Sequence, residues 1–117
     1  MELEVVKDIV QWGLDRNIIQ SSSLEAQFIK LEEELNELRD AIRDGDNAGI
    51  ADAIGDMGVV LIMMGEIFGK KVDPDDYEDG FPTDEHTSYF QKCLFLAYDE
   101  IKDRKGKLID GVFVKEE

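Results

Sequence analysis

The chain has 117 residues, of which 43% are hydrophobic, enough for one domain with a modest core. Its 28 acidic and 13 basic side chains give a formal net charge of −15, which disfavours binding to nucleic-acid polymers and to anionic membranes. Charged side chains at positions 2, 4, 7 and 8 argue against a signal peptide, and the uncharged run 57–65 is too short to span a bilayer. Cys93 is the only cysteine, so a reducing, cytoplasmic setting is predicted.

The first part of the chain is predicted to form two helices, because apolar residues recur there at helical spacing. The first helix covers residues 2–16. The second begins after the serine run 21–23, where Ser22 and Glu25 have the spacing of a capping box. Its apolar seam has alternating spacings of four and three residues, at positions 24, 28, 31, 35, 38 and 42. We expect this helix to end near residue 43, before the turn Asp44–Asp46.

A third helix is predicted over residues 47–68, and its segment 57–64 is apolar on every side. A helix that is apolar all round is normally buried. Four glycines lie within the predicted helix, and each costs about 1 kcal/mol relative to alanine. Close packing against neighbouring helices is therefore expected.

The rest of the chain predicts a loop, a fourth helix and a hairpin. Residues 70–82 are rich in aspartate and contain both prolines, which is typical of a loop. Thr83 is the expected cap of a fourth helix that runs to about Arg104. Beyond it, Asp110–Gly111 between two short apolar segments predicts a tight hairpin with a primed turn.

Together these elements predict a single all-α domain over residues 1–117, an antiparallel four-helix bundle with a short C-terminal β-hairpin. Three short neighbours are too few to cover so apolar a third helix. We therefore expect an oligomer of identical chains, either a homodimer or a homotetramer.

Acidic residues of the second helix share one face. At about 100° per residue, Glu33, Glu34 and Glu37 lie on this face together with Lys30, away from the apolar seam. Like charges three and four positions apart repel each other. Acidic faces are also common on solvated helices, so this face alone fits an ordinary surface as well as a binding site.

The third helix carries Asp52 and Asp56, four positions apart on an otherwise apolar helix. Asp52 lies in the first turn, where an acid favours the helix dipole, whereas Asp56 needs a partner because an ionised carboxylate is not buried alone. One kind of partner is a basic residue, namely Lys30, Lys102 or Arg104. The other is a divalent cation between the two acidic faces, and carboxylate oxygens favour Mg²⁺ or Mn²⁺. His86 is the only histidine, which argues against zinc or a di-iron centre.

The two acidic helices together resemble the MazG-like branch of the all-α nucleoside triphosphate pyrophosphohydrolases, a superfamily that also contains the dimeric dUTPases. The pattern of that superfamily is Glu-Glu-x-x-Glu on one helix and Glu-x-x-Asp on the next. The matching residues here are Glu33, Glu34, Glu37 and Asp56. The glutamate of the second half falls on Ala53, and Asp52 is the candidate for the missing carboxylate. The resemblance covers about residues 24–105, and the tail 98–116 is similar to the ending of MazG-like proteins of the phage and bacillus type.

This resemblance implies a Mg²⁺-dependent enzyme that hydrolyses a nucleoside triphosphate between the α and β phosphates. The products are the monophosphate and pyrophosphate, and the role is nucleotide-pool cleaning. The implied metal ligands are Glu34, Glu37, Asp52 and Asp56. Glu33 is the implied catalytic residue, which orders or deprotonates the attacking water. A triphosphate is anionic and needs cations, for which the candidates are Lys30, Lys102, Arg104 and Lys105. The nucleobase needs an aromatic surface, for which the candidate is Trp12.

Two other functions fit the sequence. Because a glutamate is missing at Ala53, the same fold would also serve as a metal- or nucleotide-binding regulatory module with little or no turnover. The net charge fits an acidic helical interaction protein as well, including a mimic of nucleic acid.

Overall fold

The computed structural model describes residues 3–72 and 86–116. The elements in these ranges are α1 (Glu4–Asp15), α2 (Ile18–Ser21), α3 (Leu24–Asp44), α4 (Asn47–Gly69), α5 (Tyr89–Ile101), β1 (Gly106–Ile109) and β2 (Val112–Lys115). A mostly helical chain with a small C-terminal antiparallel hairpin is thereby confirmed. Most of the predicted loop 70–82 and the predicted cap Thr83 lie outside the described residues.

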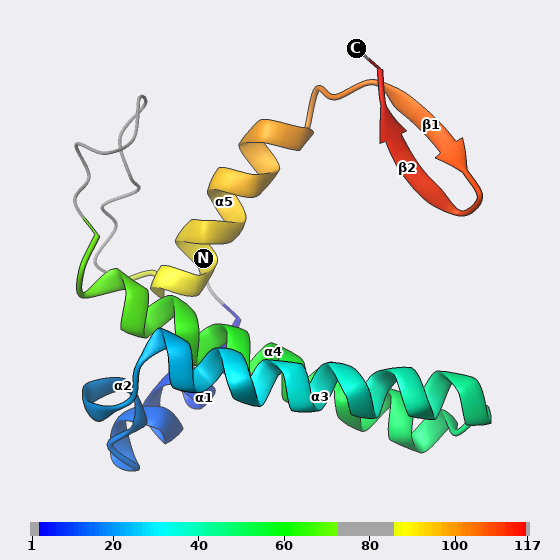
Figure 1. Cartoon of the computed structure of the whole chain (residues 1–117). Helices are drawn as coiled ribbons and strands as arrows, with labels where there is room; N and C mark the ends of the chain where they lie inside the picture. The colour runs from blue at the N-terminus through cyan, green and yellow to red at the C-terminus, as the bar shows by residue number, and fades with distance from the viewer. Residues whose placement is uncertain (1–2, 73–85, 117) are drawn as a thin grey trace.

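Helices α3 and α4 form an antiparallel pair, which is the most extensive contact between elements of the chain (Figure 1). Helix α3 ends at Asp44, its C-cap Gly45 has a left-handed φ of 66°, and the chain reverses at once. The carboxylate of Asp46 then accepts a hydrogen bond from the backbone N–H of Gly49 at 3.0 Å and starts α4. So short a turn holds the two helices side by side and brings the acidic face of α3 next to α4.

The start of α3 differs from the prediction. Ser23, and not Ser22, is the N-cap, because its Oγ accepts a hydrogen bond from the backbone N–H of Ala26 at 3.1 Å. The Oγ of Ser22 accepts instead from Nε2 of Gln27 at 3.1 Å. The sequence pattern also missed α2, a four-residue helix that Asn17 separates from α1 through its left-handed φ of 60°.

Helix α5 is shorter than predicted, since it runs from Tyr89 to Ile101 rather than to Arg104. Its first turn is held by the Oγ of Ser88 and by a tertiary contact, in which Oε2 of Glu66 on α4 accepts a hydrogen bond from Tyr89 N at 2.7 Å. A Cβ atom at position 65, where α4 has a glycine, would lie 2.9 Å from N and Cα of Phe90. Only glycine there lets α5 cross α4 so closely.

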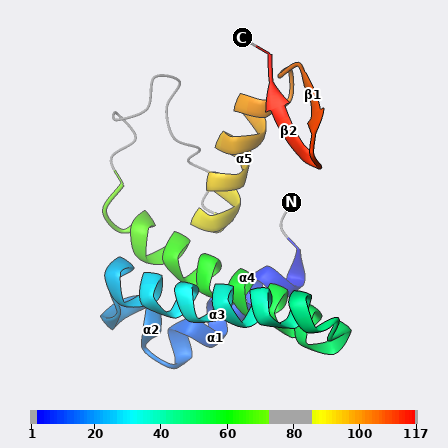
Figure 2. The ribbon, with the colours of Figure 1, turned by 45° about the vertical axis from the view of Figure 1, so that its right-hand side comes forward.

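Helix α4 is the centre of the helical body, because α1, α2, α3 and α5 all pack against it. The buried core consists of Ile19, Ile62 and Met63, flanked by partly buried apolar side chains of α1, α2 and α5. Helix α5 leaves this body at an angle and makes no contact with α3 in the described structure (Figures 1 and 2). The described part of a single chain therefore does not confirm the predicted four-helix bundle.

By length and composition α4 is also apolar enough to cross a membrane, with a mean hydropathy of 1.6 over its most apolar window. Core helices of soluble proteins meet the same test, so this result does not place the chain in a membrane. Only 28% of that window is buried within the single chain. Much of the apolar surface of α4 is therefore open to a further partner.

The C-terminal hairpin stands apart from the helices. Asp110 (φ 51°) and Gly111 (φ 80°) form the predicted primed turn, and β1 pairs with β2 in the register Leu108 with Phe113. Neither strand contacts a described helix. The radius of gyration is 16.3 Å, whereas a compact domain of this length has about 13 Å. The chain is therefore more extended than a self-contained domain.

Candidate metal and substrate site

Glu34 is the buried acid of α3 and lies where α3 packs against α4. Its side chain is 5% exposed, although glutamate is rarely buried without a partner. Lys30, one turn earlier, has its Nζ 3.2 Å from Oε1 of Glu34. The other oxygen, Oε2, is buried and accepts no hydrogen bond from any described residue. An ionised oxygen in this position calls for a cation or a proton.

Two further carboxylates face Glu34. Glu37 lies one turn along α3 and Asp56 comes from α4, and one oxygen of each of the three residues lies within 4.8 Å of the others. In the described part of the chain, Asp56 forms no ion pair with a lysine or an arginine. The antiparallel pairing of α3 and α4 thus brings together three of the five acids that the sequence assigned to the site.

Crowding raises the pKa of two of these carboxyl groups. For Asp56 the largest cause is burial, followed by the charges of Asp52 and Glu34. For Glu37 the main cause is the neighbouring carboxyl of Glu34, which favours a proton shared between the two groups, followed by repulsion between their charges. When both groups are ionised, no such proton is present. A divalent cation would replace the proton and remove the repulsion.

Lys30 supplies part of the missing positive charge. Its hydrogen bond to Glu34 and the charge of that carboxylate raise the pKa of Lys30, so its ammonium group stays protonated. The charge of Lys30 in turn lowers the pKa of Glu37 and of Asp56, although both remain raised. One lysine beside three carboxylates leaves an excess of negative charge at the site.

The donor set fits a hard divalent cation. Carboxylate oxygens without imidazole or thiolate ligands are typical of Mg²⁺ and Mn²⁺ sites. In octahedral Mg²⁺ sites with bonds of about 2.1 Å, ligand oxygens lie about 3 to 4.2 Å apart. Oxygens within 4.8 Å of one another therefore need only small shifts to bind one ion. The described histidine, His86, lies elsewhere, in a hollow that Glu66 and Lys7 also line.

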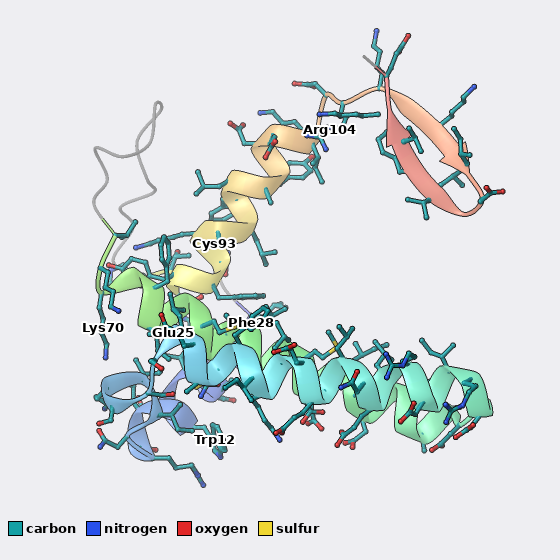
Figure 3. All side chains as sticks on the ribbon, viewed as in Figure 1. Trp12, Glu25, Phe28, Lys70, Cys93 and Arg104 are labelled. Carbon is teal, nitrogen blue, oxygen red and sulfur yellow. The ribbon has the colours of Figure 1, made fainter. Side chains whose placement is uncertain are left out.

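A pocket of about 410 Å³ opens beside the carboxylates. It is lined by Trp12, Ile18, Gln27, Lys30, Glu34, Asp56, Val59, Val60 and Met63. Trp12 is 41% exposed, and the guanidinium of Arg16 lies 4.7 Å from the centroid of its indole ring. Figure 3 shows Trp12 below α3, on the side of α1 and α2. The pocket lining therefore combines charged side chains with aromatic and aliphatic ones.

The two remaining predicted acids lie outside the group of three. Glu33 is exposed, and its Oε2 is 3.5 Å from Nζ of Lys30. Asp52 is exposed on α4 and acts on Asp56 through its charge. Ala53, where the resembled pattern has a glutamate, is buried. The structure thus places Glu33 beside the pocket-lining lysine, and Asp52 is exposed and outside the pocket lining.

The basic residues after α5 do not line the pocket in a single chain. Figure 3 shows Arg104 at the far end of α5, well away from Trp12, and α5 packs on α4 rather than on α3. Two of these basic residues form local ion pairs, Lys102 with Asp99 at 2.8 Å and Arg104 with Glu100 at 3.3 Å. Of the predicted substrate-binding cations, the single chain brings only Lys30 to the described pocket.

Gln27 lines the pocket but was not among the predicted residues. It precedes Lys30 by three positions and Glu34 by seven, so helical spacing alone places all three on one face. This spacing was the available signal. A search that begins from charged residues overlooks a neutral amide.

Comparisons with known proteins find a relative that matches part of this chain, and they identify no family. No protein-family profile matches the chain, and no solved structure matches it. An uncharacterized 18.2 kDa protein in the rep-hol intergenic region of Haemophilus phage HP1 (strain HP1c1) is 39% identical over 61 residues. The match covers 52% of this chain and 37% of the phage protein, so it spans little more than a third of that relative. Functional conclusions therefore rest on the site.

Proposed function

We propose that the chain is a Mg²⁺-dependent nucleoside triphosphate pyrophosphohydrolase that cleaves between the α and β phosphates. The observation that carries this proposal is the buried Oε2 of Glu34, which has no hydrogen-bond partner in the described structure and lies against Glu37 and Asp56. The adjoining pocket of about 410 Å³ is within the usual size range of small-molecule sites. The resemblance of the two acidic helices to the MazG-like enzymes supports the same reaction.

In this proposal Glu34, Glu37 and Asp56 hold Mg²⁺ or Mn²⁺, while Asp52 acts on the site only through its charge on Asp56. A bound ion would supply positive charge to the phosphate oxygens and polarise the bond that breaks. The chain itself holds three carboxylates close together before any substrate arrives. This arrangement favours binding of the metal complex of a triphosphate over binding of the free anion.

The side chains around the carboxylates would position the substrate. Lys30 lines the pocket beside Glu34 and provides a fixed charge for a phosphate oxygen. Glu33 is exposed to solvent next to Lys30, and in this proposal it would accept a proton from the attacking water. Trp12 offers its indole ring to the nucleobase in the pocket.

We also propose that the chain works as a homodimer or a homotetramer. Large apolar side chains of α3 and α4 are exposed in the single chain, namely Phe28, Ile29, Leu35, Ile42, Ile54 and Leu61. Gly55 and Gly58 face open space, so another helix can approach α4 closely. The α3–α4 pairs of two copies would complete a four-helix bundle. Lys102, Arg104 and Lys105 would contribute to substrate binding where the assembly brings them to a pocket.

Pyrophosphate release from a panel of nucleoside triphosphates tests the enzymatic proposal. We expect turnover that needs Mg²⁺ or Mn²⁺, stops in EDTA, and is largely lost in Asp56→Asn. Glu32→Gln is the matched control, because Glu32 is exposed on α3 and outside the carboxylate group. Circular dichroism confirms that both variants fold. No turnover with any nucleotide, or equal activity of the two variants, contradicts the proposal.

A metal- or nucleotide-binding module without turnover is the second candidate. Buried Ala53 favours it, because the position cannot supply the fourth carboxylate of the resembled pattern. Isothermal titration calorimetry distinguishes the two functions. Mg²⁺-dependent nucleotide binding without pyrophosphate release would support the module.

A further inference from the structure

The hairpin of β1 and β2 carries apolar side chains on both faces. Leu108 and Phe113 are paired on one face, and Ile109, Val112 and Val114 lie on the other. All five are exposed, between 44% and 72%. A two-stranded hairpin is marginally stable in water, and a strand with one wet face alternates apolar and polar residues. Two apolar faces therefore indicate that both are covered in the working protein.

An apolar groove of about 350 Å³ lies on the helical body, lined by residues from the start of the chain and from α5. Its apolar lining consists of Leu3, Val6, Phe90, Leu94, Phe95 and Tyr98. The hairpin of the same chain does not fill it, because neither strand contacts α1 or α5. Figure 1 shows the hairpin beyond the C-terminal end of α5. Groove and hairpin are thus two apolar surfaces of one chain that do not meet.

The charge of the C-terminal segment indicates which partner covers the hairpin and the groove. Residues 102–115, called the C-terminal arm here, carry five basic and two acidic side chains, and the acidic Glu116 and Glu117 follow them, so that residues 102–117 have a net charge of +1 in a chain whose net charge is −15. The arm is therefore a slightly basic segment attached to a strongly acidic body. A second copy of this chain offers both the acidic surface and the apolar groove that the arm lacks in its own chain.

We propose that the C-terminal arm of one copy docks in the groove between α1 and α5 of a second copy. The face with Leu108 and Phe113 would fill the groove, and the basic residues of the arm would lie over the acidic body of that copy. Reciprocal exchange about a two-fold axis would place each hairpin between two helical bodies, so both of its apolar faces would be covered. This contact is separate from the α3–α4 interface and does not depend on hydrolysis.

Photocrosslinking in the full chain tests the proposal. Phe113 is replaced by p-benzoylphenylalanine in an affinity-tagged copy, which is mixed with an untagged copy and irradiated. We expect a covalent dimer in which mass spectrometry locates the attachment in residues 3–6 or 90–98 of the other copy. Attachment within the same chain, attachment to α3 or α4 of the other copy, or no crosslink overturns the proposal.

Hydrogen exchange provides a second measurement with matched variants at one position. Phe113→Asp puts a charge into the proposed contact, whereas Phe113→Leu keeps an apolar side chain there. At equal protein concentration, we expect the amides of residues 90–98 to exchange several-fold faster in the aspartate variant and at the wild-type rate in the leucine variant. Equal exchange in both variants overturns the proposal, whether or not the enzymatic proposal holds.

Discussion

The most direct prediction concerns Glu34→Gln and the stabilisation of the fold by Mg²⁺. A ligand that binds only the folded chain stabilises it by RT ln(1 + [L]/Kd). If about 5 mM Mg²⁺ is about ten times the dissociation constant, this is about 1.4 kcal/mol. For a chain of this length, that corresponds to a rise in Tm of about 6 °C. We expect this rise in the wild type and most of it to be lost in Glu34→Gln, because Glu34 is the buried member of the carboxylate group.

The Tm of Glu34→Gln in EDTA separates a loss of metal binding from a loss of fold stability. Replacing Glu34 by glutamine removes the charge that raises the pKa of Glu37 and Asp56, which relieves repulsion. It also takes away the ion-pair partner of Lys30 at 3.2 Å. These effects oppose each other, so we expect a smaller change of Tm in EDTA than the lost Mg²⁺ response.

Differential scanning fluorimetry with Mg²⁺ titrated against EDTA measures both quantities at fixed protein concentration. Glu32→Gln makes the same change of charge on an exposed position of α3 and should keep the full response. The reasoning fails if Mg²⁺ raises Tm equally in Glu34→Gln and in Glu32→Gln. It also fails if the wild type does not respond, because three crowded carboxylates would then not bind the ion.

Four other predictions concern particular residues. Because the pKa values of Glu37 and Asp56 are raised, Mg²⁺ affinity should fall as pH drops through them, which calorimetry at several pH values measures. In EDTA the folded chain binds the protons of Glu37 and Asp56 more tightly than the unfolded chain does. The free energy of unfolding should therefore decrease as pH rises through the raised pKa values, and urea titrations that show an increase would contradict this. Gly65→Ala should lower the free energy of unfolding, measured in urea, by about 1–3 kcal/mol. The new Cβ would meet the backbone of Phe90, and this cost exceeds the helix-propensity gain of about 1 kcal/mol. Unchanged stability would contradict so close a crossing of α4 and α5. Trp12→Leu should raise KM for nucleotides with little change in kcat, whereas Trp12→Phe should keep a low KM, and equal KM values would remove Trp12 from the base site.

The helices that pack on each other were predictable because their signals are local. Helices α3 and α4 begin and end within a residue or two of the predicted positions, since Gly45 and Asp46 are strong stop and start signals. Helix α2 was not predictable, because its four residues are too few for a periodic pattern. The start of α5 depends on Glu66, a side chain of α4 that contacts Tyr89, and local spacing contains no information on such a contact.

The carboxylate group was predictable from spacing and from the short turn between its helices. The prediction that Glu33 and Glu34 share a face away from the apolar seam was wrong for Glu34. Glu34 lies three residues after Leu31 and four before Leu38, both partly buried, and is itself buried, whereas Glu33 lies two residues after Leu31 and is exposed. Glu34 therefore faces α4 and Glu33 faces solvent. The position of the basic residues after α5 was not predictable, because the packing of Gly65 against Phe90 sets the direction of α5.

Ala53 determines how many carboxylates the site can offer. It is 2% exposed and lies one turn before Asp56, so a glutamate there would add another charge where burial already raises the pKa of Asp56. Asp52 is one position earlier, about 100° around the helix, and is exposed. It raises the pKa of Asp56 through its charge but is not part of the carboxylate group of Glu34, Glu37 and Asp56. With three carboxylates, the other positions around Mg²⁺ fall to water and phosphate oxygens, which this ion retains readily. Metal affinity should therefore depend strongly on a bound triphosphate, and metal and nucleotide should bind cooperatively.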